Sequence, residues 1–425
     1  MGLVQAPGLF FDSAFRRVNV MKLLIIGAGA IGSVIADVCA KDNAYDEIIL
    51  ADLKREIAED VKKRLGDNKK ITPIALNANN VVEMKKAMKG VDMTVNATLP
   101  RFFLKIMQAC VESGSSYLDM ATDLAVYNES PGTVIKRIPL DMQLDMDQAY
   151  KDQGIAGMLC WGAEPGAVNV WARYAADQMD SVDTIQVRDG DTATVEGHHA
   201  LVSFWSPDTL IEEVAFMNSL VWTKGRFERQ APLTKSEEWD FPQPLGKQRV
   251  WQVDHEEIQT MGRFMGKGVK EVNFMLGLSD EFVTALKVLK SIGMVSPDPI
   301  DVKGVKIVPR DVITSLMPTP TDPAFQSKIK GHGCCSVKVI GKKSGKKIQH
   351  YLWNVMAHHE CYKKYGGTAT AVQTGLPPAV AVIMRAKKEI TMNGVYPPES
   401  LDPLPIIKRF EEFGFMTSEE KREIV

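Results

Sequence analysis

The sequence predicts an α/β protein: a doubly wound parallel sheet of the Rossmann type, followed by a second α+β domain with a mixed sheet. Three observations predict this class. Apolar runs alternate with helical patterns over the first 165 residues, and a glycine-rich turn follows the first run. After residue 166 this alternation gives way to a different sequence pattern. A chain of 425 residues is also too long for one ordinary core, so two or three domains are expected.

Short apolar runs in the first half predict strands at 22–26, 47–53, 71–76, 93–97, 117–121 and 155–161. Helical periodicity between some of them predicts helices at 28–37, 55–65, 80–89 and 102–113. Strands that alternate with helices of this length are typical of a parallel sheet covered on both faces. Such a sheet binds its ligands at the carboxyl ends of the strands.

A glycine-rich turn follows the first predicted strand and opens the first predicted helix. In its GxGxxG pattern, Gly27 allows a tight turn, Gly29 lets a pyrophosphate approach the backbone, and Gly32 lets helix and strand pack closely. The free N–H groups at the helix start then face the anion, where the helix dipole favours negative charge. The turn therefore predicts a dinucleotide site formed by Gly27, Gly29, Ala30, Ile31 and Gly32.

A carboxylate ends the second predicted strand, twenty residues after Gly32. Asp52 in that place accepts hydrogen bonds from ribose hydroxyls and repels a 2′-phosphate, so it favours NAD. NADP is the alternative, because the basic residues Lys54 and Arg55 follow. The fourth predicted strand ends in residues expected beside the nicotinamide ribose: Asn96, Ala97 and Thr98.

Composition and charge exclude several classes of partner. The net charge of −2 gives no basic field for nucleic acid, and no apolar stretch approaches the ~18 residues of a membrane span. Six cysteines without a CxxC pair are typical of reduced thiols in a cytoplasmic protein. The adjacent His358 and His359 would point about 100° apart on a helix and share a metal poorly, so no metal site is expected.

The second half of the chain has a different pattern. A helix is expected at 166–179 and strands at 184–188, 336–341 and 349–355, with a hairpin turn at 342–347 and an irregular stretch at 204–265. We therefore divide the chain into an N-terminal extension (1–20), a dinucleotide-binding domain (21–165), a substrate and dimerisation domain (166–370) and a C-terminal segment (371–425).

Several motifs resemble those of the saccharopine dehydrogenase-like oxidoreductases, which include saccharopine reductase, lysine 6-dehydrogenase and carboxynorspermidine dehydrogenase. The motifs are the turn at 27–32, the strand at 117–119, the GAEPGAVN segment at 162–169, and the segments at 374–381 and 394–399. The resemblance implies that 371–425 return to the Rossmann domain and that the middle domain pairs two subunits in a homodimer. The second half and its NAD-type acid most resemble lysine 6-dehydrogenase, although Glu164 stands where several members have Asp.

The resemblance also implies hydride transfer between nicotinamide and the C–N bond of an amino acid or amine of the saccharopine or lysine type, through an imine. An amine with a pKa near 10 must lose a proton before hydride can leave its carbon, so a proton acceptor is needed. The candidates for proton transfer and substrate binding are Asp119, Asp123, Glu164, His198, His255 and Arg188.

Most of these candidates have a structural alternative. Asp123 suits a helix cap, and Glu164 suits the start of the following helix. Arg188 suits a carboxylate clamp or a salt bridge with a neighbouring acid, and most histidines in any chain are not catalytic. The alternative function is a non-catalytic dinucleotide sensor or scaffold, which predicts a closed or apolar cleft.

Overall fold

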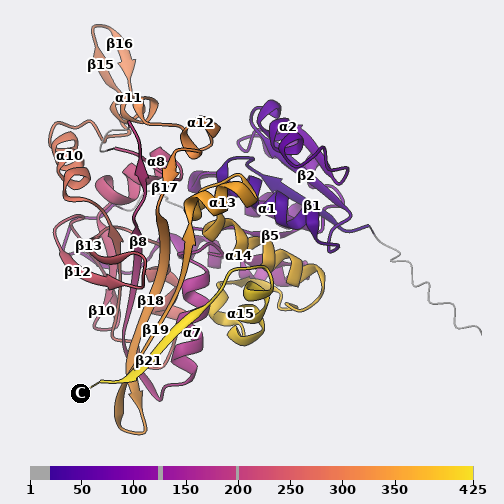
Figure 1. The fold of residues 1–425 in the computed structure, drawn as a ribbon. Helices are drawn as coiled ribbons and strands as arrows, with labels where there is room; N and C mark the ends of the chain where they lie inside the picture. The colour runs from indigo at the N-terminus through magenta and orange to yellow at the C-terminus, as the bar shows by residue number, and fades with distance from the viewer. Residues whose placement is uncertain (1–19, 123–127, 198–200, 425) are drawn as a thin grey trace, which may run out of the picture.

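The computed structural model describes residues 20–122, 128–197 and 201–424. Its two sheets form two regions of the molecule (Figure 1). Asp123 and His198 lie outside the described residues.

The first sheet has seven parallel strands in the order β20-β7-β5-β4-β1-β2-β3. Leu23, Leu24 and Ile25 of β1, an interior strand, are fully buried, as a strand with helices on both faces requires. The predicted doubly wound sheet is therefore confirmed. Its strands are β1 (Lys22–Ile26), β2 (Glu47–Asp52), β3 (Ile71–Ala75), β4 (Met93–Asn96), β5 (Ser116–Leu118), β7 (Ala156–Met158) and β20 (Gly394–Tyr396).

Helices from both ends of the chain cover this sheet. The long C-terminal helix α14 packs on α1, and a Cβ at Gly375 would lie only 2.8 Å from Val34 Cβ. The helices of this region are α1 (Ala30–Lys41), α2 (Arg55–Arg64), α3 (Val81–Ala87), η1 (Pro100–Phe102), α4 (Phe103–Ser113), α5 (Pro139–Leu144), α6 (Asp147–Asp152), α14 (Ala369–Ala386) and α15 (Pro403–Glu412).

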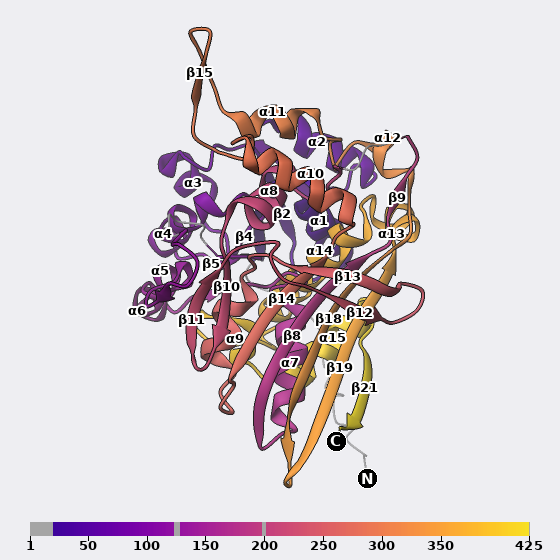
Figure 2. The ribbon, with the colours of Figure 1, turned by 90° about the vertical axis from the view of Figure 1, so that its left-hand side faces the viewer.

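The second sheet is mixed, as predicted: β8 and β14 run parallel, and the other pairs are antiparallel. Its long strands β8, β14, β18 and β19 lie side by side (Figure 2). Its strands are β6 (Val134–Ile135), β8 (Ser181–Asp191), β10 (Ser219–Thr223), β11 (Arg226–Gln230), β12 (Ser236–Phe241), β13 (Gly246–Gln252), β14 (Glu271–Gly277), β18 (His332–Lys343), β19 (Lys346–Ala357) and β21 (Ser418–Glu423).

The rest of this region consists of helices and small hairpins around the second sheet. One hairpin, β15 with β16, projects from the body of the molecule (Figure 1). These elements are α7 (Ala167–Asp177), α8 (Pro207–Ile211), the π-helical turn η2 (Glu212–Phe216), α9 (Glu257–Phe264), α10 (Asp280–Ser291), α11 (Pro309–Leu316), α12 (Pro323–Gln326), α13 (His358–Tyr365), η3 (Pro398–Ser400), and the strands β9 (Thr194–Val195), β15 (Ile300–Val302), β16 (Val305–Ile307) and β17 (Ile329–Lys330).

The structure corrects the expectation of an irregular stretch at 204–265. That stretch contains four strands, β10 to β13, and the helical segments α8, η2 and α9. Their sequence pattern is weak because each strand spans only five to seven residues and places charged residues beside aromatic ones, as in Arg226–Gln230. The hairpin turn expected at 342–347 is present, with Ser344 and Gly345 at positive φ between β18 and β19.

The C-terminal segment contributes one strand to each of the two sheets. Strand β20 extends the first sheet beside β7, and α14 covers it, so the chain does return to the Rossmann region. Strand β21, however, pairs with β19 at the edge of the second sheet. In the opposite direction, β6 from the first half of the chain pairs with β11. The chain therefore crosses between the two regions more often than the sequence indicated.

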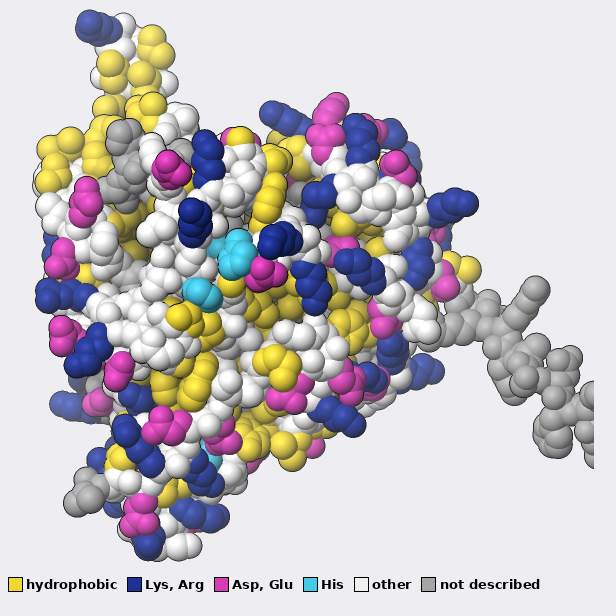
Figure 3. Space-filling model, viewed as in Figure 1, with side chains coloured by type: hydrophobic (Ala, Val, Ile, Leu, Met, Phe, Trp, Pro, Cys, Tyr) yellow, Lys and Arg dark blue, Asp and Glu magenta, His cyan; other side chains and the backbone are white. Residues whose placement is uncertain are grey.

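The surface carries charges of both signs. Figure 3 shows Lys and Arg side chains interspersed with Asp and Glu over the face in view. Among the described residues, no helix has the length and apolar character needed to cross a bilayer. Within the same residues, no cluster of three or more His, Cys, Asp or Glu side chains is arranged to hold a metal ion.

Candidate functional site

A cavity of about 750 Å³ lies between the two regions of the molecule. The first sheet contributes the turn after β1 and the ends of β2 and β4, through Gly27, Asp52 and Thr98. The second region contributes Glu164 and His255, among others. We call this space the main cavity.

The glycine turn has the shape that a dinucleotide needs. Gly27 has a φ of 105°, and its N–H donates to Ala51 O at 2.8 Å. A Cβ at Gly32 would lie 1.8 Å from Gly27 O, so only glycine lets α1 approach β1 this closely. A Cβ at Gly29 would meet none of the chain's described atoms within 4 Å, because Gly29 faces the main cavity. This open space at the start of α1 fits a pyrophosphate.

Asp52 stands beside this turn and also lines the main cavity. Its Oδ2 accepts a hydrogen bond from the Ala28 N–H at 2.9 Å, so the carboxylate is held at the mouth of the turn. Of the two basic residues that follow, Arg55 pairs with Glu59 on its own helix at 2.8 Å. The Asp52 carboxylate, at the end of β2, is therefore placed between the glycine turn and the main cavity.

Asn96, Ala97 and Thr98, at the end of β4, do not all face the main cavity. Ala97 and Thr98 line the main cavity, whereas Asn96 is fully buried behind them. Asn96 Oδ1 accepts from the Thr98 N–H at 3.1 Å and from Thr98 Oγ1 at 2.6 Å, and its Nδ2 donates to Tyr117 Oη at 3.0 Å. Asn96 thus orients Thr98 from below. Ala30 and Gly32 also lie outside the lining, which Gly27, Gly29 and Ile31 form.

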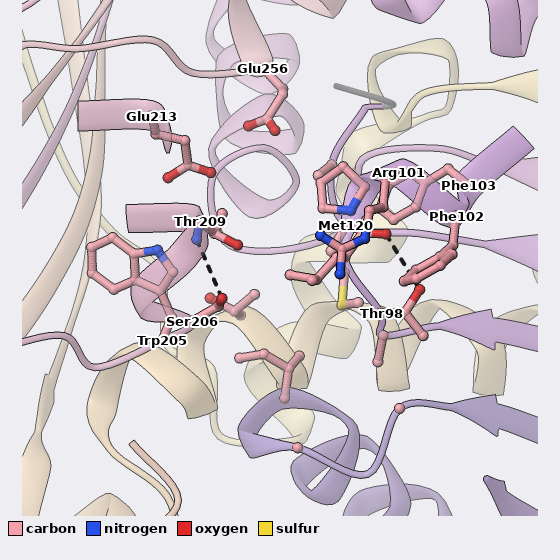
Figure 4. A pocket seen from close by; sticks show the side chains of 18 of the residues that line it. Thr98, Arg101, Phe102, Phe103, Met120, Trp205, Ser206, Thr209, Glu213 and Glu256 are labelled. Carbon is pink, nitrogen blue, oxygen red and sulfur yellow. Dashed lines mark hydrogen bonds between the residues drawn. The ribbon is translucent and has the colours of Figure 1, made fainter. Parts of the chain in front are cut away.

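Four carboxyl groups line the opposite side of the main cavity, and we call them the acidic wall: Glu164, Asp189, Glu213 and Glu256. They come from the loop between β7 and α7, from β8, from the π-helical turn η2, and from the loop before α9. Figure 4 shows the carboxyl groups of Glu213 and Glu256 across the cavity from Arg101 and Phe102.

Glu164 and Asp189 form a coupled pair within the acidic wall. Burial and the charge of Asp189 raise the pKa of Glu164 well above its ordinary value, and burial and the charge of Asp191 raise the pKa of Asp189 to about 7. The hydrogen bond between the two raises the pKa of Glu164 and lowers that of Asp189, so Glu164 holds the shared proton. Glu164 Oε2 is buried and has no hydrogen-bond partner among the described residues.

Glu256 and Glu213 form the other end of the wall, around His255. Burial, opposed by His255 and reinforced by Glu257, raises the pKa of Glu256 to about 7. Burial and Glu256 raise the pKa of Glu213 well above its usual range. Both carboxyl groups therefore take up protons near neutral pH unless a cation binds beside them.

His255 is held between an acid and an aromatic ring. Its Nδ1 lies 2.5 Å from Glu257 Oε2, and its ring stacks on Phe274 with the centroids 4.0 Å apart. Burial lowers the pKa of His255, but the charges of Glu257, Glu256 and Glu213 outweigh it and raise the pKa well above its ordinary value. The imidazole is therefore a cation at neutral pH, and it partly balances the wall.

Two of the described residues predicted for proton transfer or substrate binding, Asp119 and Arg188, do not line the main cavity. Asp119 lies beneath it, where Oδ1 accepts from the Cys160 N–H and Oδ2 from Gln143 Nε2, both at 2.7 Å. Burial raises the pKa of Asp119 to about 8. Its carboxyl group connects the segments that follow β5 and β7, which end at Leu118 and Met158, before the residues expected from the sequence.

Arg188 corrects the expectation of a carboxylate clamp facing the cleft. Its side chain is 1% exposed, and its Nη2 and Nε bond to Glu237 Oε1 at 2.7 and 2.9 Å. The guanidinium also lies 4.8 Å from the ring centroid of Trp239. Side chains alternate along a strand, so when Asp189 faces the cavity Arg188 must face the other way. The salt bridge foreseen for Arg188 exists, but its partner is not a neighbour in sequence.

Sequence reasoning missed three members of the acidic wall: Asp189, Glu213 and Glu256. The alternation along β8 held a usable signal for Asp189, since one of the pair Arg188 and Asp189 must face the cleft. Glu213 and Glu256 lay in the stretch expected to be irregular, where no pattern indicated their direction.

Comparison with known proteins identifies the family. Residues 23–158 match the saccharopine dehydrogenase NADP binding domain, and residues 162–415 match the saccharopine dehydrogenase C-terminal domain. The chain belongs to the saccharopine dehydrogenase family. It is therefore an oxidoreductase with an NAD(P)-binding domain that acts on C–N bonds. The resemblance inferred from the motifs is confirmed, and the alternative of a non-catalytic sensor is not supported.

Relatives in this saccharopine dehydrogenase family carry polyamine names. Carboxynorspermidine synthase of Vibrio cholerae is 30% identical over 409 residues, which are 93% of this chain and 95% of the relative. Carboxyaminopropylagmatine dehydrogenase of Synechocystis sp. is 27% identical over 404 residues, 92% of this chain and 96% of the relative. The comparisons therefore do not favour the expected role in lysine metabolism over a role in polyamine metabolism.

Two solved structures share the fold. Apo saccharopine dehydrogenase (L-Glu forming) from Saccharomyces cerevisiae has a TM-score of 0.68 at 15% identity and covers 95% of this chain and 100% of its own. Homospermidine synthase from Legionella pneumophila, solved in complex with NAD, has a TM-score of 0.67 at 14% identity and covers 95% of this chain and 91% of its own. The homodimer expected from the sequence stays a prediction.

Proposed function

We propose that this protein catalyses the reductive condensation of an aldehyde with a diamine or polyamine, using NAD(P)H, to form a secondary amine. The observation that carries the proposal is the acidic wall, whose four carboxyl groups face the main cavity. A diamine carries a positive charge at each end at neutral pH, and such a ligand needs carboxylates rather than guanidinium groups.

The balance of charges in the cavity supports an amine over a dicarboxylic substrate. Besides the acidic wall, Asp52 lines the cavity, while Arg101 is the one guanidinium among its described lining residues. A saccharopine-like substrate carries several carboxylates, which would meet unpaired acids here at a cost in binding free energy. A polyamine would instead keep the wall ionised, because each ammonium lowers the pKa of the carboxyl groups beside it.

The names of the relatives support the same chemistry. Dividing carboxynorspermidine at its secondary amine gives an aldehyde with an amino-acid head group and 1,3-diaminopropane. Dividing carboxyaminopropylagmatine gives the same aldehyde and agmatine. Both pairs join through an imine: the amine and the aldehyde lose water, and the imine then gains one hydride and one proton.

The residues present fit a dinucleotide. The glycine turn would hold its pyrophosphate and Asp52 its adenosine ribose; when bound, the nicotinamide supplies the hydride. Because Asp52 repels a 2′-phosphate and Arg55 is paired with Glu59, we further propose a preference for NAD(H) over NADP(H). Ala97 and Thr98, at the end of β4, lie where the nicotinamide half would pass.

Different residues of the acidic wall bind the amine and transfer the proton. Glu213 and Glu256 bind the distal ammonium of the amine and orient its reacting nitrogen. Glu164, which holds the proton it shares with Asp189, donates that proton to the imine nitrogen, and the cation then accepts hydride readily. Glu164 afterwards takes up a proton again from solvent or from the ammonium group of the next amine. His255 keeps its charge and limits the repulsion among the acids.

The test is an oxidation assay of NADH and NADPH with the purified protein. We expect turnover with aspartate β-semialdehyde together with 1,3-diaminopropane or agmatine, and none with either compound alone. The same preparation is assayed for NAD reduction with lysine and with saccharopine. Turnover with lysine or saccharopine and none with any aldehyde and diamine pair would contradict the proposal.

A further inference from the structure

A second, smaller cavity of about 340 Å³ opens beside the main cavity. Arg101 and Thr209 line both spaces, as do Leu99 and Pro100, so the two share a wall. We call this space the side cavity. The Arg101 side chain therefore borders both spaces.

The side cavity carries charges of both signs, unlike the main cavity. Its ionisable lining residues are Arg101, Asp208, Glu212, Arg310 and Asp311. Glu212 and Glu213 are neighbours on the π-helical turn η2, and one lines the side cavity while the other lines the main cavity. The turn thus separates a mixed-charge space from an acidic one.

Arg310 is built into the wall of the side cavity. Its side chain is 3% exposed, it pairs with Glu212, and it lies 3.8 Å from Asp208. Its Nε donates to Val295 O at 2.9 Å, while its buried Nη2 has no hydrogen-bond partner among the described residues. A buried guanidinium N–H without a partner is costly, and a ligand oxygen would satisfy it.

Arg101 stands at the boundary between the two cavities. Among the described residues no carboxylate forms an ion pair with it, and its guanidinium lies 5.1 Å from the centroid of the Phe102 ring. Figure 4 shows it beside Phe102 and Phe103, across from Glu213 and Glu256. An exposed guanidinium without an ion-pair partner is suited to bind a carboxylate through two parallel hydrogen bonds.

We propose that the side cavity is the subsite for the amino-acid head group of the aldehyde substrate. Arg101 binds its carboxylate, and Asp208 and Asp311 bind its α-ammonium, while the aldehyde carbon reaches the main cavity. The proposal rests on the proposed function, and it names the group that distinguishes this aldehyde from a simple one. A zwitterion matches a mixed-charge space, as a diamine matches the acidic wall.

The kinetic test compares two aldehydes in the Arg101→Ala variant. The KM for an aldehyde that carries the head group, aspartate β-semialdehyde, should rise ~10- to 100-fold, which is the loss expected for a charged hydrogen-bonded pair. The KM for propanal, which lacks the head group, and the KM for the diamine should change less than about twofold. Arg137→Ala is the matched control, because this exposed arginine pairs with Asp145 away from both cavities.

A binding test separates this inference from the proposed function. Titration calorimetry with L-homoserine, an unreactive head-group probe, in the presence of NADH should show binding to the wild type and to Arg137→Ala but not to Arg101→Ala. Binding of homoserine by a wild type that condenses no aldehyde and amine would sustain the subsite and remove the function. Normal condensation with an unchanged aldehyde KM in Arg101→Ala would sustain the function and overturn the subsite.

Discussion

The glycine turn and the acidic wall face each other across one cavity, yet they are built in different ways. The turn and Asp52 lie within 26 residues of each other and bind through backbone N–H groups and one carboxylate. The acidic wall collects side chains from four separate segments between residues 164 and 256. A site for a common cofactor can be specified locally, whereas a site for a particular substrate is assembled by the fold.

The two sites also differ in what burial does to them. In the turn, burial is favourable, because Gly32 lets α1 and β1 pack closely. In the wall, burial raises the pKa of Glu164, Glu213 and Glu256, so the ionised site is costly until a cation arrives. The ionised acidic wall thus lowers the free energy of unfolding of the protein without substrate, and a bound amine relieves this cost.

The largest expected effect comes from the proton donor of the wall. Glu164→Gln keeps the volume of the side chain and removes the proton that we assign to the imine nitrogen. The kcat for reductive condensation should fall ~10²- to 10³-fold, with the KM for NADH unchanged. Steady-state kinetics at saturating amine measure this.

Glu238→Gln, on an exposed position of β12, is the matched control and should retain full activity. If Glu164→Gln and Glu238→Gln were equally active, Glu164 would not be the donor, and the wall would serve binding alone.

An intermediate effect is expected at the glycine turn. Asp52→Ser combined with Leu53→Arg removes the carboxylate and places a guanidinium at an exposed position of the cavity rim. The ratio of kcat/KM for NADPH to that for NADH should rise ~10-fold or more, because a 2′-phosphate is no longer repelled and gains a partner.

Asp52→Asn is the control for charge alone, since its amide oxygen still accepts from the Ala28 N–H. It should shift the preference by a smaller factor in the same direction. A ratio that stays constant in both variants would show that Asp52 does not face the ribose.

The smallest effect is a change in stability with pH. Glu256 has a pKa of about 7 in the folded protein, above the 4.5 of the unfolded chain. The folded state therefore binds the extra proton between these values, and the stabilising contribution of this group is lost as the pH rises from about 4.5 to 7. Glu256→Gln, which cannot ionise, should raise the Tm by ~2–5 °C at pH 8 and change it little at pH 5.

Thermal unfolding at the two pH values, with and without 1,3-diaminopropane, checks this prediction. The diamine should raise the Tm of the wild type at pH 8 more than that of the variant, because it pairs with the ionised carboxylate. An equal change in Tm at both pH values would show that Glu256 titrates as it would in water.

Comparing individual residues with their predictions shows why some predictions were correct and others were not. The strands of the first sheet could be predicted because buried parallel strands are short apolar runs, as at Leu23 to Ile26. The turn could be predicted because its pattern has a steric reason at Gly32, where a Cβ would collide with Gly27 O, and leaves open space at Gly29. Arg188 was predicted to face the cleft because its side-chain chemistry suits a substrate carboxylate, yet the register of β8 directs it to Glu237.

The sequence by itself determined the class of the fold, the place of the dinucleotide turn and the sign of charge at its rim. These properties depend on periodicity and on contacts between residues close in the chain. Only the tertiary structure decided which acids share a cavity, which of two neighbours on β8 faces it, and that a second, mixed-charge space adjoins it. The physical reason is that burial and the proximity of other charges set the pKa of a carboxyl group, and both arise when distant segments pack together.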